Sequence, residues 1–432
     1  MSNYFKEKFL HYIWQHQLFD KEGITTQNNE EILVIHPGYY NTNAGPDFLQ
    51  AKIKIDNIEW NGAVEVHYKS SDWLLHKHHE NQAYENVILH LVWENDIEIL
   101  YQNGQVIPVI ALKFRIPYQF VYQFENLIKT QAFIPCENLI QNVPNIVIKK
   151  TMERAMMNRF ENKSEIVLAR YQQNQSNWEE TAYQTIAFAF GLKINADTFL
   201  RLATALPIKY LLKHRDNLLQ LEALLFGVAG FLTSPPEDEY SAKLQTEYQF
   251  LKHKYQLNNE LHVSEWKFLR LRPVAFPTVR LAQFGALVHT IPNFFNLISL
   301  LEAPEKFLKK WTITQSDYWQ NHYQLGVKAN SKIGKVGNDM LFSIVINAIV
   351  PLVFAQAQEN EQYELKENCF YLLEKLKPEK NSILAHWEQM GVKASNAADS
   401  QALLELYKNQ CSQKQCLQCS IGNHIMKTSK NE

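Results

Sequence analysis

Asp47, Glu65 and His67 are residue types that can together bind a metal ion and move a proton. A hard divalent cation such as Mg²⁺ takes one or two protein carboxylates and leaves its other positions to water and phosphate oxygens. Such a cation lowers the pKa of a bound water and neutralises charge that develops on phosphorus. We therefore predict an Mg²⁺ or Mn²⁺ site at Asp47 and Glu65, with His67 as the base or as a further ligand.

A predicted β-hairpin would position these residues. Apolar and polar residues alternate over 48–55 and over 60–68, and the Asp56-Asn57 turn joins the two predicted strands. Glu65 and the histidine two positions after it point to the same face, and Asp47 starts the first strand. The alternative is that Asp47 only caps a turn while Glu65 pairs with a lysine across the hairpin.

The same residues resemble the PD-(D/E)XK nuclease superfamily, in which an Asp after a Pro begins one strand and Asp/Glu-X-Lys follows on the next. Pro46-Asp47 matches the first half, and Glu65-Val66-His67 matches the second with His in place of Lys. The resemblance implies a restriction-endonuclease-like core that hydrolyses nucleic-acid phosphodiester bonds. It also implies an acidic residue on the preceding helix, for which Glu7 is the candidate. Because histidine replaces lysine, the alternative is a catalytically inactive nucleic-acid-binding or scaffold protein with a structural metal site.

Histidines gather in the segment after the second predicted strand, at His76, His78 and His79. A strong zinc pattern would be His-Glu-X-X-His, and this tract does not match it. We interpret the tract as a solvated or site-facing stretch in which His76 or His79 contacts a phosphate. A further alternative is a transition metal bound by His67, His76 and His90.

Three cysteines near the C-terminus, Cys411, Cys416 and Cys419, follow the pattern C-x₄-C-x₂-C. Thiolates at this spacing are soft ligands for zinc or an iron–sulfur cluster such as [4Fe–4S], which then needs a fourth ligand. His424 is the local candidate and Cys136 the distant one. The alternative is a set of reduced thiols, since an odd count of five cysteines does not predict disulfides.

A basic cluster with interleaved aromatic residues contains Arg270, Arg272 and Arg280. Arginines spaced in this way can grip phosphates and stack on bases, so we predict that they contact DNA or RNA. They can equally pair with the acidic loop at 235–240 and hold helices together.

Composition is that of an ordinary globular protein, with 432 residues, 46% hydrophobic and 20% charged. A net charge of −2 gives no global basic field, so a nucleic acid must be held by a local patch. The N-terminus lacks the pattern of a signal peptide, and we expect no stretch near the roughly 18 apolar residues of a membrane span. The sequence therefore predicts a cytoplasmic protein without a membrane partner.

The pattern along the chain predicts an α+β protein in three regions. Residues 1–118 are expected to form a nuclease-like domain, a mixed sheet flanked by helices in the order helix, three strands, helix or loop, strand. Apolar residues at helical spacing then predict an α-helical domain at 119–300 and a helical C-terminal region with the cysteine cluster at 301–432.

Motifs spread over the chain identify it as a member of a bacterial family known as domain-of-unknown-function family 2851. They are GPDF, GAVEVH, SSDW, LHLVW, EALLFGVAG, LRLRPVAFPTVRLAQF and C-x₄-C-x₂-C. The resemblance spans nearly the full length but implies no activity, so the functional hypothesis depends on the residues above.

Overall fold

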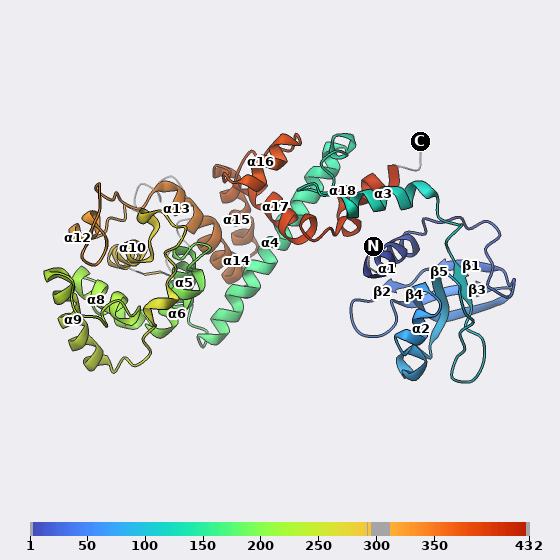
Figure 1. The fold of residues 1–432 in the computed structure, drawn as a ribbon, viewed down its shortest axis with the longest axis horizontal. Helices are drawn as coiled ribbons and strands as arrows, with labels where there is room; N and C mark the ends of the chain where they lie inside the picture. The colour runs from blue at the N-terminus through green and yellow to red at the C-terminus, as the bar shows by residue number, and fades with distance from the viewer. Residues whose placement is uncertain (1–2, 292, 295–311, 429–432) are drawn as a thin grey trace. The chain divides into compact units, whose positions relative to one another are not determined.

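The computed structural model describes residues 3–291, 293–294 and 312–428. The fold is mixed α+β, with a curled mixed sheet near the N-terminus and helices over most of the remainder (Figure 1). The chain divides into two compact units, each described here separately. The first comprises Met1–Thr151, Gln389–Gly391 and Leu406–Glu432, and the second comprises Met152–Glu388 and Val392–Glu405. The predicted boundary between residues 300 and 301 lies outside the described residues.

The sheet of the first unit has the strand order β1-β3-β4-β5-β6, with β2 paired to β3. The strands are β1 (Ile32–His36), β2 (Tyr39–Tyr40), β3 (Phe48–Ile55), β4 (Ile58–Lys69), β5 (Val87–Glu94) and β6 (Val109–Ala111). β1, β2 and β4 each pair antiparallel with β3, while β4 pairs parallel with β5 and β5 pairs parallel with β6. This mixture follows from the chain, because a tight turn joins β3 to β4 whereas a crossover joins β4 to β5.

The hairpin predicted from alternation is present as β3 and β4. Asp56 has a left-handed backbone (φ 50°) in the turn, a conformation that Asp tolerates. The register shifts between Phe48 and Ala51, and Gln50 also has positive φ (57°) there. This bulge puts an irregularity at the start of β3, next to Asp47, where a simple alternation predicts none.

The crossover from β4 to β5 contains short helices: α2 (Asp72–Leu75), η1 (His78–Glu80) and η2 (Gln82–Tyr84). β5 is buried along most of its length, as its nearly continuous apolar sequence VILHLVW predicts for a parallel central strand. In the parallel register Glu65 of β4 lies opposite His90 of β5. The two polar side chains therefore emerge side by side from the middle of the sheet.

Helix α1 (Asn3–Gln15) packs against β4 through its apolar face, which includes Leu10, Ile13 and Trp14. Trp14 Nε1 donates to the carbonyl of Pro37 (2.9 Å), which fixes the helix to the segment between β1 and β2. Two later helices of this unit, α3 (Tyr118–Lys129) and α18 (Ser420–Thr428), pack on each other (Figure 1). The C-terminal segment thus belongs to the same unit as the sheet.

The second unit begins within α4 (Asn145–Gln173). Within its described residues it is helical apart from the two short strands β7 (His322–Gln324) and β8 (Val327–Lys328). Its other helices of eight residues or more are α5 (Trp178–Phe190), α6 (Ala196–Ala205), α8 (Leu218–Val228), α9 (Glu239–Tyr255), α10 (Pro277–Thr290), α14 (Val350–Glu359), α15 (Tyr363–Lys375), α16 (Ser382–Gln389) and α17 (Ala397–Leu406).

One expectation from the sequence was wrong. The continuous helix Asn338–Glu359 has a mean hydropathy of 2.1 over its most apolar window, and it is long and apolar enough to cross a membrane. However, 83% of that window is buried within the protein. A buried core helix can be as apolar as a membrane-spanning helix, because both are surrounded by apolar groups. The length and composition of a helix therefore do not distinguish the two.

Gly62 lies where β4 closely approaches the segment before β5. A substitution at Gly62 therefore tests the packing of these two segments. A Cβ at this position would lie 2.5 Å from both the Asn86 carbonyl oxygen and Ile88 Cγ2, so Gly62→Ala should overpack the sheet. We expect a loss of about 1–3 kcal/mol in the free energy of unfolding of the first unit, measured by calorimetry of the full chain. Gly334→Ala, where a Cβ meets nothing within 4 Å, is the control. An unchanged unfolding midpoint for Gly62→Ala would contradict this reading of the strand packing.

Candidate metal centre

Asp47 and Glu65 are locked together by reciprocal hydrogen bonds between neighbouring strands. The Asp47 amide donates to Glu65 Oε2 (3.1 Å), and the Val66 amide donates to Asp47 Oδ2 (3.0 Å). Each carboxylate is thus fixed by the backbone beside the other. Hydrogen bonds to backbone amides stabilise a carboxylate and remove much of its rotational freedom. Both side chains are therefore held in place before any ligand arrives.

Histidines surround the other oxygen of Glu65. His78 Nε2 lies 3.2 Å from Glu65 Oε1, and His67 Nε2 lies 3.6 Å from the same oxygen. His67 also faces two further imidazoles, with its Nδ1 at 2.8 Å from His90 Nε2 and its Nε2 at 3.1 Å from His76 Nδ1. Among the described residues, His67, His76 and His78 form the one group of three or more potential ligands whose atoms all lie within 4.8 Å of one another.

The crossover from β4 to β5 carries His76 and His78. Asp72 Oδ2 accepts from the Lys69 amide (2.9 Å) at the start of α2. After α2, Lys77 adopts a left-handed conformation (φ 59°), which reverses the chain between the two histidines. Non-glycine residues rarely adopt this conformation, so surrounding contacts must maintain it.

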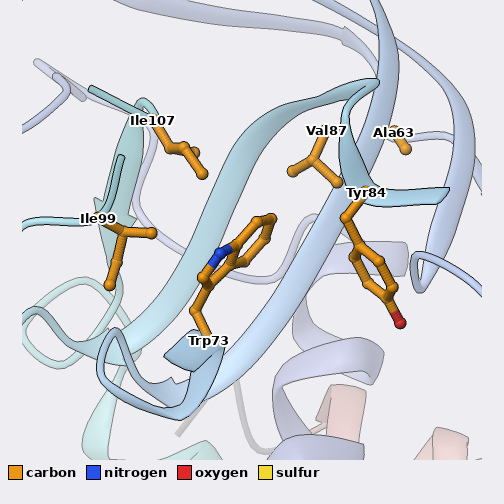
Figure 2. Packing of buried hydrophobic residues seen from close by; sticks show 6 residues of the cluster. All are labelled: Ala63, Trp73, Tyr84, Val87, Ile99 and Ile107. Carbon is orange, nitrogen blue, oxygen red and sulfur yellow. The ribbon is translucent and has the colours of Figure 1, made fainter. Parts of the chain in front are cut away.

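A cluster of buried apolar residues packs against the histidines. Trp73, Tyr84, Val87, Ile99, Ile107 and Ala63 pack together, with Trp73 in the middle and Tyr84 beside it (Figure 2). The Trp73 ring lies edge-on to the rings of His67 and His78, and Tyr84 stacks on His78 with ring centroids 3.8 Å apart. The ring planes of these histidines are therefore set by packing as well as by polar contacts.

Burial dominates the electrostatics of the cluster. Burial, followed by the negative charge of Asp47, raises the pKa of Glu65 well above its ordinary value. Burial lowers the pKa of His67, and the neighbouring His90, His78 and His76 lower it further. Burial likewise lowers the pKa of His90 to about 3. The imidazoles of His67 and His90 are thus neutral at physiological pH, and the neutral imidazole is the form that ligates metals.

Helix α1 contributes a third acidic residue, Glu7, and a further histidine, His11. His11 Nε2 lies 3.2 Å from Asp47 Oδ2. Burial raises the pKa of Glu7, while the charges of His76 and His11 lower it and those of Asp72 and Asp47 raise it. Glu7 therefore lies within electrostatic reach of the Asp47 and histidine groups.

The structure brings together five of the residues singled out in the sequence: Asp47, Glu65, His67, His76 and Glu7. His79 instead pairs with Glu80 (3.4 Å). Sequence reasoning assigned no role to His11, and it placed His78 in the histidine tract without assigning it to the site. The sequence did contain a signal for His11, because His11 lies one helical turn after Glu7 and residues at that spacing share a helix face.

The predicted arginine cluster lies in the second unit, around η5 (Pro273–Ala275) and the start of α10. Arg270 and Arg272 are exposed. Arg280 is half-buried and donates to Gln283 Oε1 (2.8 Å), and burial lowers the pKa of its guanidinium. Only the first two therefore present their charge freely to solvent.

Cys136, Cys411, Cys416 and Cys419 all lie in the first unit and all are buried. Burial raises the pKa of Cys136 to about 12, with contributions from Cys416 and Cys419, and Cys411 interacts electrostatically with the other three. Lys414 Nζ, in the loop between Cys411 and Cys416, donates to the Thr130 carbonyl (2.8 Å). That contact holds the C-terminal cysteine loop beside the segment that leads to Cys136.

A family model described as protein of unknown function (DUF2851) matches residues 7–382, so the chain belongs to this family. No curated protein and no solved structure matches the chain. Functional conclusions must therefore come from the geometry described above.

Asp96 holds the start of the crossover that carries His76, and its replacement tests this contact. It accepts from the Ser71 amide (2.9 Å) and hydroxyl (2.8 Å). Partial burial raises its pKa, but these hydrogen bonds and those involving Ser70 lower it, and the net pKa is below the ordinary value. A depressed folded-state pKa stabilises the protein above the unfolded-state pKa, and this stabilisation is lost as the pH falls through the folded-state value.

We therefore expect Asp96→Ala to reduce the free energy of unfolding of the first unit by roughly 1 kcal/mol at pH 7. The difference from the parent should shrink at pH 3, measured by urea titration at both pH values. Glu98→Ala, at an exposed carboxylate two positions along the chain, is the control. A loss that is the same at both pH values would show that the Asp96 charge is not involved.

Proposed function

We propose that the first unit is a metal-dependent, nuclease-like domain that acts on nucleic-acid phosphodiester bonds. The observation that carries the proposal is the interlocked pair Asp47 and Glu65, fixed on adjacent strands with neutral histidines beside it. The order of elements supports it, because α1, the antiparallel β1-β3-β4 strands, α2 and then parallel β5 follow the restriction-endonuclease-like plan of helix, three strands, helix, strand.

In this proposal the Asp47 and Glu65 carboxylates hold Mg²⁺ or Mn²⁺, which would activate a water and neutralise charge on the phosphate. His67 orients or deprotonates the attacking water, and its own orientation is fixed by His90. Glu7 completes the acidic shell from α1, at the position that the superfamily resemblance implies. His76, which is exposed, would contact a phosphate oxygen, and so would His79.

The nucleic acid, DNA or RNA, would be held in part by the second unit. Exposed Arg270 and Arg272 are the candidates, with Arg280 nearby in the chain. Guanidinium groups suit phosphate because their donors match two oxygens at once. We further propose that the protein works in the cytoplasm, as the sequence predicts.

A second candidate function follows from His67 itself. Lysine at this position would remain cationic, whereas His67 is buried, neutral and surrounded by other imidazoles. The same domain could then bind nucleic acid, or serve as a scaffold with a structural metal site, without cleaving the chain. The cleavage experiment below separates the two functions.

Cleavage of single- and double-stranded DNA and RNA by the purified full chain, with Mg²⁺ or Mn²⁺, tests the proposed function. Asp47→Ala and Glu65→Gln should each reduce the rate by at least about 100-fold, because each removes a metal ligand or its charge. Lys54→Ala, on the same hairpin, should cleave like the parent. Cleavage that persists in Asp47→Ala would contradict the proposal. Binding without cleavage of any substrate would favour the second candidate.

We also propose that Cys411, Cys416 and Cys419, with Cys136 or His424 as the fourth ligand, bind zinc or a [4Fe–4S] cluster. Four buried thiols within electrostatic reach of one another support Cys136. A thiolate–metal bond would offset the cost of burying the charged form of each cysteine.

Elemental analysis of protein purified without oxygen tests this cysteine site. Parent protein should carry zinc, or iron with sulfide and a brown colour, and Cys416→Ser should lose about one site equivalent per chain. Cys369→Ser is the control, because Cys369 is buried in the second unit, where its thiol faces the Val350 carbonyl. Equal metal content in Cys416→Ser and the parent would rule out this site.

A further inference from the structure

We propose that His67, His76 and His78, with Glu65 as a fourth ligand, bind one first-row transition-metal dication of the zinc class. This inference goes beyond the proposed function, because it adds a second metal position that shares Glu65 with the Asp47 and Glu65 pair. The proposal that an ion binds at this position rests only on the geometry given below. Ion binding can be measured without any cleavage assay.

Three of the distances among the four side chains are close to those between ligands of one metal ion. His67 Nε2 and His76 Nδ1 are 3.1 Å apart, while Glu65 Oε1 lies 3.2 Å from His78 Nε2 and 3.6 Å from His67 Nε2. Zinc binds nitrogen and oxygen at about 2.0–2.2 Å, so two ligands of a tetrahedral site lie roughly 3.3–3.5 Å apart. These three distances lie close to this spacing, and the ligand nitrogens of the three histidines all lie within 4.8 Å of one another.

The hydrogen-bonding pattern among these groups also points to a cation. His78 Nε2 is buried and lies 3.2 Å from Glu65 Oε1, but within the part of the chain that the structure describes it makes no hydrogen bond of suitable geometry. His67 uses Nδ1 to contact His90, which leaves its Nε2 facing another imidazole nitrogen and the Glu65 carboxylate. If His67 carries its proton on Nδ1, lone pairs of nitrogen and oxygen converge at one point, and a cation would accept them all.

The surroundings of His67 are those of a metal ligand. A ligating histidine commonly donates its second ring N–H to another polar group, which fixes the tautomer and the ring orientation. His90, fully buried on β5, is in that position. Tyr84 stacks on His78, and Trp73 lies edge-on to both His67 and His78. These aromatic contacts set the orientation of the ligand rings.

The donor set selects the class of metal. Imidazole nitrogens suit zinc, iron, nickel and copper, whereas Mg²⁺ prefers oxygen and retains several waters. Glu65 Oε2 is engaged by the Asp47 amide, so Oε1 is the oxygen turned toward the histidines. Asp47 itself bonds to the Val66 amide and faces His11. Asp47 therefore lies beside this site without being one of its ligands.

His76 provides access to the site. Its side chain is exposed, whereas the side chains of His78 and His67 are only 11% and 2% exposed. An ion can therefore reach the two inner histidines past a residue at the surface. Because His76 is exposed, its replacement should leave the fold intact, and it makes the cleanest test variant.

Co²⁺ alone serves as the probe, titrated into the chelator-treated full chain and followed by calorimetry and by visible absorption. Parent protein should bind Co²⁺ at this site, and His76→Ala and His78→Ala should each weaken binding at least about tenfold. His16→Ala should keep the parent affinity, and Asp47→Asn should weaken binding much less than His78→Ala, because neither residue is a ligand of this ion. Excess Mg²⁺ should not displace the ion. The cysteines are unchanged in all these variants, so differences between them report the histidine site.

Equal Co²⁺ affinity in the parent and in His76→Ala would overturn the inference. A loss in Asp47→Asn as large as in His78→Ala would overturn it too, because the ion would then be held by the carboxylate pair. Near-ultraviolet circular dichroism checks that each variant is folded, and His76→Ala alone suffices if His78→Ala is not. Failure of cleavage with intact Co²⁺ binding would remove the proposed function and leave the metal site standing.

Discussion

Polar side chains buried in the middle of a sheet must find partners, and this constraint organises the first unit. Glu65 and His67 of β4 and His90 of β5 all lie in the interior, where an unpaired charge or donor is costly. Each of them is met by a group from another segment. Asp47 at the start of β3 bonds to Glu65 through its amide, and His78 approaches the same carboxylate from the crossover. The pairing thus draws together parts of the chain that are distant in sequence.

The rest of the unit maintains that pairing. The bulge in β3 lies directly after Asp47, and the parallel register of β4 and β5 puts His90 beside Glu65. Asp96 fixes the turn at Ser71, and the apolar cluster around Trp73 holds the imidazole rings. Rigid support of this kind keeps ligand atoms in position before a ligand binds, which reduces the cost of binding. Preorganisation explains why so many polar contacts surround a few side chains.

The sequence predicted those features that depend on local pattern. Alternation identified the hairpin, and the same pattern placed Asp47 near Glu65, where the Asp47 amide donates to Glu65 Oε2. The roles of His78 and His11 were missed for physical reasons. His78 reaches Glu65 because Lys77 adopts a left-handed conformation that nothing in its residue type requires. His11 faces Asp47 because α1 packs on the sheet, a tertiary contact that periodicity indicates only as an apolar face.

The central claim is that a metal ion binds where the histidines and Glu65 converge. Its most direct test is anomalous X-ray diffraction from crystals of the full chain grown with Zn²⁺. The account predicts a peak within about 2.0–2.2 Å of a nitrogen of His67, His76 and His78 and of an oxygen of Glu65. No peak at these three histidines, whether or not a peak appears at Asp47 and Glu65 or at the cysteines, would contradict it.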